Sequence, residues 1–304
     1  MTATLDHLDL PEPSKPIHSV FLEETQFRAK FQRFGKAPPE LTVQKVNFGR
    51  DVDRYRRAAE NGNLSCFPGR KTRNQDRLPD EESVERSQRR AKTKLRLAVV
   101  ELAPNQFLTF STRKVYALDD LLKIWTRFCA LTKTVDPDVD YVAVPELHPN
   151  GVPGHYHLHV AARLRSSCSN STRFWHMAIE AHEGRRVTRI LKGAESPGYC
   201  KPRNEGLNGK QGFKRGRKIA KYISKYVTKE MVERFNRKRY WISKGINVQQ
   251  AQVFWLSSLS QGDAIREACL ITGAWDGLAP AFKAFTPSDR VFWMPFDIVH
   301  EPPF

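Results

Sequence analysis

Three histidines alternate along one short stretch, at His155, His157 and His159, and this spacing could bring them to one metal ion. Successive side chains of a β-strand point to opposite faces, so all three would project from the same face of a strand. Imidazole nitrogen binds divalent metals, and a carboxylate from a paired strand could complete an open site. Glu146 ends the preceding apolar run and would return beside them across a turn. A solvent-exposed polar strand face is the competing interpretation.

A second pattern, Tyr-x-x-Lys, occurs twice in succession, beginning at Tyr222 and at Tyr226. On a helix the two tyrosines would share a face one turn apart, and Lys225 and Lys229 would repeat the same offset. A phenol, with a pKa near 10, is a weak nucleophile at neutral pH. A neighbouring ammonium and a metal-polarised phosphate would ease its deprotonation. An ordinary amphipathic helix with tyrosines in the core would give the same pattern.

Together these motifs resemble a known family of nucleases. Phe107–Ser111, then Glu146 with Gly154–Val160, then Tyr222–Tyr226 follow one another in this order. They look like motifs one, two and three of the HUH endonuclease superfamily. The paired tyrosines resemble its two-tyrosine branch, the replication initiators of rolling-circle plasmids and single-stranded DNA phages. The resemblance covers about Leu95–Glu230 and depends on three independent motifs.

The resemblance implies a metal centre. His157 and His159 would be ligands, with Glu146 or His155 as the further ligand. A second register, in which His155 and His157 bind the metal, also remains open. The implied ion is Mg²⁺ or Mn²⁺, and imidazole ligands make Mn²⁺ the easier fit.

The resemblance also implies an activity. Tyr222 would be the first nucleophile, Tyr226 the second, and Lys225 the motif lysine. The protein would nick one strand of single-stranded or hairpin origin DNA and transfer it through a 5′-phosphotyrosine. A host DNA polymerase and a separate helicase would be needed, because the chain has no G-x-x-x-x-G-K-[ST] phosphate loop. Three alternatives stay open: a single-tyrosine transposase of the same superfamily, a phosphate-ester hydrolase, and a non-catalytic nucleic-acid-binding protein.

The net charge of +17 favours a polyanionic partner, because each neutralised phosphate releases counterions. Residues 201–244 hold fifteen of the lysines and arginines against three acids, so the surplus lies around the tyrosine motif. The candidate DNA-binding residues on this predicted helix are Lys214, Arg215, Arg217, Lys218, Lys221 and Lys229.

Periodicity predicts an α+β fold, an antiparallel sheet with helices on one face, which is the palm of HUH and RRM-like domains. The expected strands are Leu95–Leu102, Gln106–Ser111, Asp140–Glu146 and Tyr156–Leu164. The expected helices are Leu118–Leu131, Phe174–Ala181 and Lys214–Lys238. We expect a nicking domain at 95–238, an N-terminal extension or small helical region at 1–94, and a C-terminal extension at 239–304.

A cytoplasmic protein with no membrane partner is expected. No apolar run approaches the ~20 residues that cross a bilayer, and Met1–Pro16 lacks the layout of a signal peptide. The five cysteines form no C-x-x-C pair, which is typical of a reducing compartment.

Overall fold

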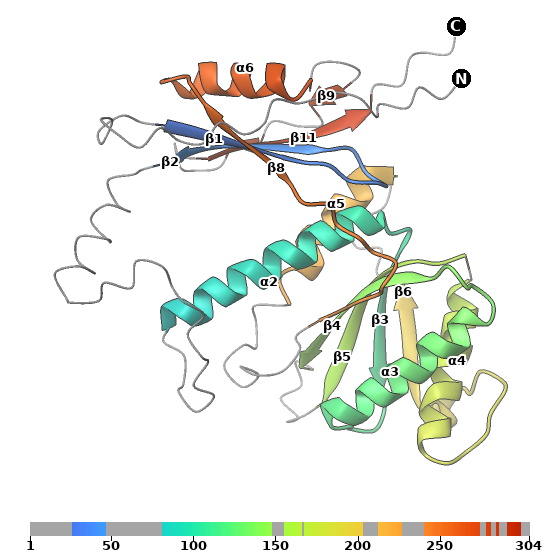
Figure 1. Ribbon diagram of the computed structural model, residues 1–304. Helices are drawn as coiled ribbons and strands as arrows, with labels where there is room; N and C mark the ends of the chain where they lie inside the picture. The colour runs from blue at the N-terminus through green and yellow to red at the C-terminus, as the bar shows by residue number, and fades with distance from the viewer. Residues whose placement is uncertain are drawn as a thin grey trace, which may run out of the picture. The chain divides into compact units, whose positions relative to one another are not determined.

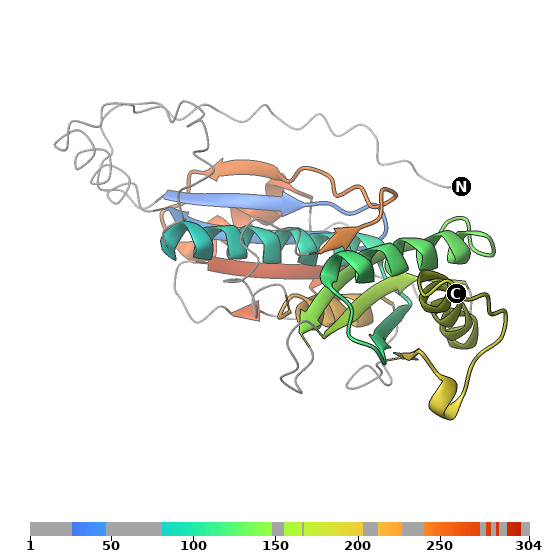
Figure 2. The ribbon, with the colours of Figure 1, turned by 90° about the horizontal axis from the view of Figure 1, so that it is seen from below.

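The computed structural model describes residues 26–46, 81–147, 155–165, 167–202, 212–226, 240–273, 278–280, 284–285 and 291–298 (Figures 1 and 2). The chain divides into two compact units. The central unit comprises Gly35–Ala37 and Leu78–Val248. The terminal unit comprises Met1–Phe34, Pro38–Arg77 and Gln249–Phe304. This division differs from the three consecutive segments expected, because residues from both ends of the chain belong to one unit.

The central unit is built on a five-stranded antiparallel sheet in the order β6-β3-β5-β4-β7. Its strands are β3 (Gln106–Thr112), β4 (Asp140–Leu147), β5 (Tyr156–Arg163), β6 (Gly198–Pro202) and β7 (Trp241–Ile242). The middle strand, β5, is buried at every position from His157 to Ala162. A strand buried on both faces needs cover on both faces of its sheet.

Helices α3 (Leu118–Lys133) and α4 (Cys168–His182) cover one face (Figure 1). Phe110 on β3 lies at the centre of their core, with ring centroids 5.5 Å from Trp125, 4.9 Å from Phe128 and 5.1 Å from Trp175. Edge-to-face aromatic pairs at these distances add stability beyond their buried area. The aromatic cluster thus fixes β3 against both helices.

Helices α2 (Glu81–Leu102) and α5 (Gly212–Ile223) pack together and against strands of the same sheet. Tyr222 of α5 contacts Phe107 on β3, whose side chain points to the face opposite Phe110, so this pair of helices covers the second face. The mixed α+β class is confirmed, but helices lie on both faces of the sheet. The helix expected at Lys214–Lys238 is α5, which ends at Ile223, and residues 224–226 form a turn, so Tyr226 is not helical. Residues 227–238 of the expected helix lie outside the described residues.

The strand predicted at Leu95–Leu102 is wrong, because this segment is the end of α2. Leu95, Ala98, Val99 and Leu102 are buried, and they recur at the spacing of one helical face. The adjacent valines Val99 and Val100 favoured a strand locally, and packing against α5 and the sheet outweighed that preference. The expected helices at Leu118–Leu131 and Phe174–Ala181 and the other three strands are confirmed within a few residues, except that α4 begins at Cys168.

The terminal unit holds a second antiparallel sheet in the order β10-β11-β2-β1-β8, with β9 paired to β11. Its strands are β1 (Gln26–Gln32), β2 (Glu40–Val46), β8 (Gln252–Leu256), β9 (Leu278–Pro280), β10 (Ala284–Phe285) and β11 (Val291–Ile298). Helix α6 (Gln261–Ile271) packs on this sheet through Ala264, Ala268 and Cys269. Within the expected N-terminal region, β1 and β2 are strands of a sheet shared with the C-terminal part, whereas residues 81–94 are helical and belong to α2.

None of the helices in the described part of the chain is long and apolar enough to cross a membrane.

Gly198, the first residue of β6, lies where a side chain has no room. A Cβ atom there would collide with the backbone carbonyl of Ser111 on β3. The same carbonyl accepts a hydrogen bond from the Trp175 indole at 2.8 Å, and the carbonyl of Gly198 accepts one from His176 Nε2 at 2.9 Å. The close approach of β6 to β3 thus requires glycine at this position.

We expect Gly198→Ala to lower the free energy of unfolding by about 1–3 kcal/mol, because the added methyl group forces two paired backbones apart. Urea unfolding followed by circular dichroism measures this change. Gly262→Ala is the matched control, because an added Cβ meets no atom within 4 Å there, and alanine is the better helix former. Equal stability of the Gly198 variant and the wild type would contradict the packing described for β6.

Candidate metal centre and tyrosine pair

The face of the central sheet that packs against α5 carries His157, His159 and Glu146 together. Glu146 on β4 pairs directly with His157 on β5 in the strand register. The carboxylate reaches diagonally along the strand, so that its Oε2 lies 2.7 Å from Nε2 of His159. The His159 side chain is 1% exposed and that of Glu146 is 12% exposed. An imidazole and a carboxylate are therefore joined in a site that is largely shielded from solvent.

The other ring nitrogen of His159 also has a fixed neighbour. Thr109 on β3 is its cross-strand partner, and the threonine hydroxyl lies 3.2 Å from His159 Nδ1. Partners on both nitrogens set the orientation and the tautomer of the ring. A hydrogen bond at the ring nitrogen that does not bind the metal, here Nδ1, usually orients a metal-ligating histidine.

The chemistry of these donors fits a divalent metal. At bond lengths near 2.1 Å, adjacent ligands of an octahedral ion lie roughly 3 Å apart, close to the 2.7 Å between the Glu146 and His159 donor atoms. His157, 9% exposed, stands directly opposite the same carboxylate. Among the described residues, no three His, Cys, Asp or Glu side chains are already gathered as a ligand set. Glu146 and His159 would therefore be the main ligands of the ion, and His157 would lie beside them.

His155 lies apart from the Glu146–His159 pair. Its Nε2 is 2.9 Å from the carbonyl oxygen of Thr112, at the end of β3, and its ring centroid is 6.1 Å from that of His157. Four residues of extended chain separate it from His159 by ~13 Å. The strand geometry thus brings Glu146, and not His155, to His159.

Tyr222, near the end of α5, and Tyr226, just after it, contact each other beside the Glu146–His159 pair. Tyr226 lies in the turn after the helix, where its amide bonds to the carbonyl of Ile223 at 3.2 Å. Its hydroxyl donates a 2.5 Å hydrogen bond to the hydroxyl of Tyr222. Its ring stacks on the His159 imidazole, with centroids 4.2 Å apart and planes 15° apart. The tyrosine and histidine motifs, more than sixty residues apart in sequence, are therefore in direct contact.

Phe107 joins these parts, a role that the spacing of the motifs did not reveal. Its ring meets Tyr222 edge-on at 5.5 Å and stacks on His159 at 6.2 Å. Phe107 and Thr109 both belong to the first motif, but only the β3–β5 register shows that they contact the site. In the sequence, the one indication of this role was that both residues belong to the first motif.

The basic residues predicted to bind DNA near the tyrosines differ in their exposure to solvent. Lys225 is exposed, and its Nζ lies 5.7 Å from the centroid of the Tyr222 ring, within reach of a cation–π interaction. Lys218 and Lys221 are exposed, whereas Arg215 and Arg217 are half-buried. The Lys214 side chain and the whole of Lys229 lie outside the described residues. A cationic helix face therefore adjoins the tyrosine pair.

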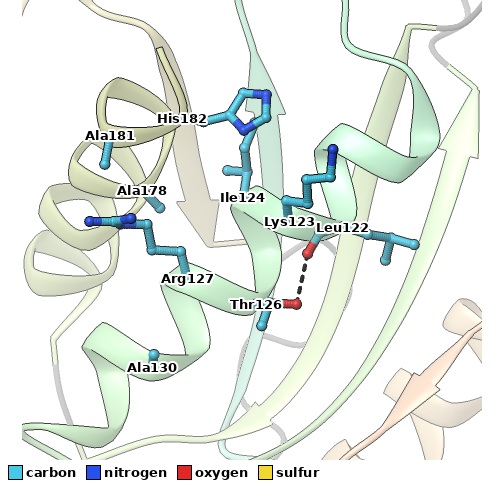
Figure 3. A pocket seen from close by; sticks show the side chains of 9 residues that line it. All are labelled: Leu122, Lys123, Ile124, Thr126, Arg127, Ala130, Ala178, Ala181 and His182. Atoms are coloured by element: carbon cyan, nitrogen blue, oxygen red, sulfur yellow. Dashed lines mark hydrogen bonds between the residues drawn. The ribbon is translucent and has the colours of Figure 1, made fainter. Parts of the chain in front are cut away.

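A separate hollow of about 570 Å³ lies between α3 and α4 (Figure 3). Its walls include Leu122, Ala130, Ala178 and Ala181, with Arg127 extending along it. These helices cover the opposite face of the sheet from His159, so the hollow is not part of the tyrosine site.

A scan against protein-family models, a search of the curated proteins and a search of the solved structures each found no match to this chain.

Proposed function

We propose that this protein initiates rolling-circle replication by nicking single-stranded origin DNA with a tyrosine, in the presence of a divalent metal. One observation carries the proposal: the Tyr226 ring stacks on His159, whose Nε2 is bonded to Glu146. A nucleophile, a metal-ligand pair and a basic helix are what phosphotyrosine chemistry needs in one place. The resemblance of the three motifs to the HUH initiators agrees with this arrangement.

The nucleophile is Tyr222 in the first step. The Tyr222 oxygen forms a bond to phosphorus as the bond from phosphorus to the 3′-oxygen breaks. The proton of the phenol passes through solvent to the departing 3′-oxygen, which becomes the primer end. Tyr226 donates its hydroxyl hydrogen bond to Tyr222, so it stabilises the phenolate as charge develops there.

A divalent ion held by Glu146 and His159 would neutralise charge on the scissile phosphate. The protein's own contribution is to fix the ligands: Thr109 holds Nδ1 of His159, and Phe107 packs against both the imidazole and Tyr222. Rigid support of this kind keeps the nucleophile and the phosphate aligned.

The short distance between the hydroxyls supports alternating use of the two tyrosines. At 2.5 Å apart, either oxygen can occupy nearly the same position beside a phosphate. After one round Tyr226 cuts the regenerated origin, and the freed 3′-hydroxyl attacks the Tyr222 phosphotyrosine. One circle is released and the protein stays attached to the new strand. A host polymerase and a separate helicase act with it in the cytoplasm.

Covalent attachment is the direct test. We expect the wild-type protein, incubated with Mn²⁺ and labelled single-stranded origin DNA, to form an adduct that survives SDS electrophoresis. Tyr222→Phe removes the first nucleophile and should lower adduct formation at least a hundredfold. Tyr226→Phe should leave a first adduct but, in a replication assay that also contains host polymerase and helicase, abolish release of a closed circle. The double variant should form none.

Tyr141→Phe is the matched control, because Tyr141 packs against Trp125 on the opposite face of the sheet, and phenylalanine keeps that ring contact. A cleaved but unattached strand would favour a hydrolase. Binding without cleavage would favour a non-catalytic nucleic-acid-binding protein. Either result overturns the tyrosine mechanism.

The metal centre has its own test. His159→Ala should lower nicking at least a hundredfold and weaken Mn²⁺ binding in calorimetry, because it removes the ligand that Thr109 and Glu146 position. Glu146→Gln keeps the shape but loses the charge, so both quantities should fall about 10–100-fold. His182→Gln, on α4, is the control. Full nicking activity in EDTA, or in His159→Ala, would refute a metal-dependent reaction.

A further inference from the structure

The sheet of the terminal unit has two chemically different faces. One face packs against α6 and is apolar, with Phe27, Ala29, Val43 and Phe254 in its core (Figure 1). Because side chains alternate along a strand, the intervening residues of β1, β2, β8 and β11 project from the other face. We call this second face the outer face.

Strand register arranges the outer face in two rows that cross four strands. The first row runs Trp255, Arg28, Gln44 and Val291, from β8 through β1 and β2 to β11. The second row runs Val253, Lys30, Thr42 and Trp293 across the same strands. The rows place two cations on β1 in the middle of the face. The two tryptophans stand on opposite sides of them, three strand spacings (~14 Å) apart across the sheet and one row (~7 Å) apart along it.

The outer face is accessible and cationic. Lys30, Gln44 and Val253 are exposed, and Val253 reaches 41%. Arg28 is half-buried, and its guanidinium donates to Gln44 Oε1 at 3.1 Å. Alternation along the described strands places two carboxylates on this face, Glu40 and, at the end of β11, Asp297. Glu40 is buried and accepts the Trp293 indole hydrogen bond. The two rows in the middle of the face therefore carry positive charge without an acid among their residues.

Positive charge beside aromatic rings on a flat sheet matches one class of ligand well. Single-stranded nucleic acid needs cations for its phosphates and aromatic side chains on which unpaired bases stack. Paired bases of a duplex are already stacked on each other and cannot use the rings. A protein–protein interface usually has an apolar core with a polar rim, whereas here the four middle positions are polar or charged.

We propose that the outer face is a binding platform for single-stranded DNA, with Trp255 and Trp293 stacking on bases and with Arg28 and Lys30 contacting phosphates. This inference rests on the proposed function, which makes single-stranded DNA the substrate. It deepens that function by adding a second contact to the strand, on a different unit from the tyrosines. Phosphate and stacking contacts of this kind hold a strand without reading its sequence.

The test measures affinity separately from nicking. The full-length chain carries Tyr222→Phe and Tyr226→Phe, and it binds a fluorescein-labelled thirty-nucleotide oligo(dT) in EDTA, followed by anisotropy. On this parent, Trp255→Ala and Trp293→Ala should each weaken binding at least about fivefold. The phenylalanine variants at both positions keep a stacking ring and should stay within about threefold of the parent.

Charge variants provide a readout that does not depend on the tryptophans. Arg28→Gln with Lys30→Gln should reduce the steepness of the salt dependence of log affinity by about 1.4, which is 0.7 for each lost phosphate contact. Arg266→Gln is the matched control, because Arg266 is a largely exposed arginine on α6, the helix that covers the other face. Urea midpoints equal to that of the parent show that each variant is folded.

Tryptophan-to-alanine variants that bind as the parent does, or an unchanged salt slope in the charge variant, would overturn the proposal. So would outer-face variants that weaken duplex binding as much as single-strand binding. Because the assay contains no metal and no nucleophilic tyrosine, it reports on the platform even if the covalent adduct is never found. Conversely, a wild-type adduct with no effect of the outer-face variants would retain the nicking function and remove the platform alone.

Discussion

The contact on which the candidate site depends is the burial of His159 in the middle strand of the central sheet. An imidazole that is 1% exposed needs partners for both of its nitrogens and for its ring. Thr109, Glu146 and Tyr226 supply them from β3, β4 and the end of α5. One side chain thereby connects three elements that are distant in sequence, and with them every motif assigned to the proposed chemistry.

Two differently composed faces make this burial possible. The α3–α4 face of the sheet is filled by aromatic and aliphatic side chains around Phe110 and Trp175. Close-packed cores of this kind deform little, so β3 and β5 present Thr109 and His159 in a fixed register. The opposite face accommodates polar side chains, because it is covered by apolar residues of α5, such as Ile219 and Ile223, and by the two tyrosines of α5 and the turn after it. Rigidity on one side thus supports the proposed chemistry on the other.

The proposed platform on the terminal unit follows the same logic. Its sheet uses one face for a core with α6 and leaves the other face to Trp255, Trp293, Arg28 and Lys30. A strand of DNA held there and cut at the tyrosine pair would contact two units of one chain. The large positive surplus of the protein is consistent with such an extended contact, because each phosphate neutralised adds to affinity.

Local periodicity in the sequence was enough to predict the strand that carries His157 and His159, the Glu146 hairpin beside it and the joint placement of Tyr222 and Tyr226. Each of these depends on residues a few positions apart. The tertiary structure decided what depends on long-range pairing: that Glu146 rather than His155 adjoins His159, that Leu95–Leu102 is helical, and that both ends of the chain share one sheet. Cross-strand register and helix packing outweigh the local secondary-structure preference of a segment, and neither can be inferred from a short window of sequence.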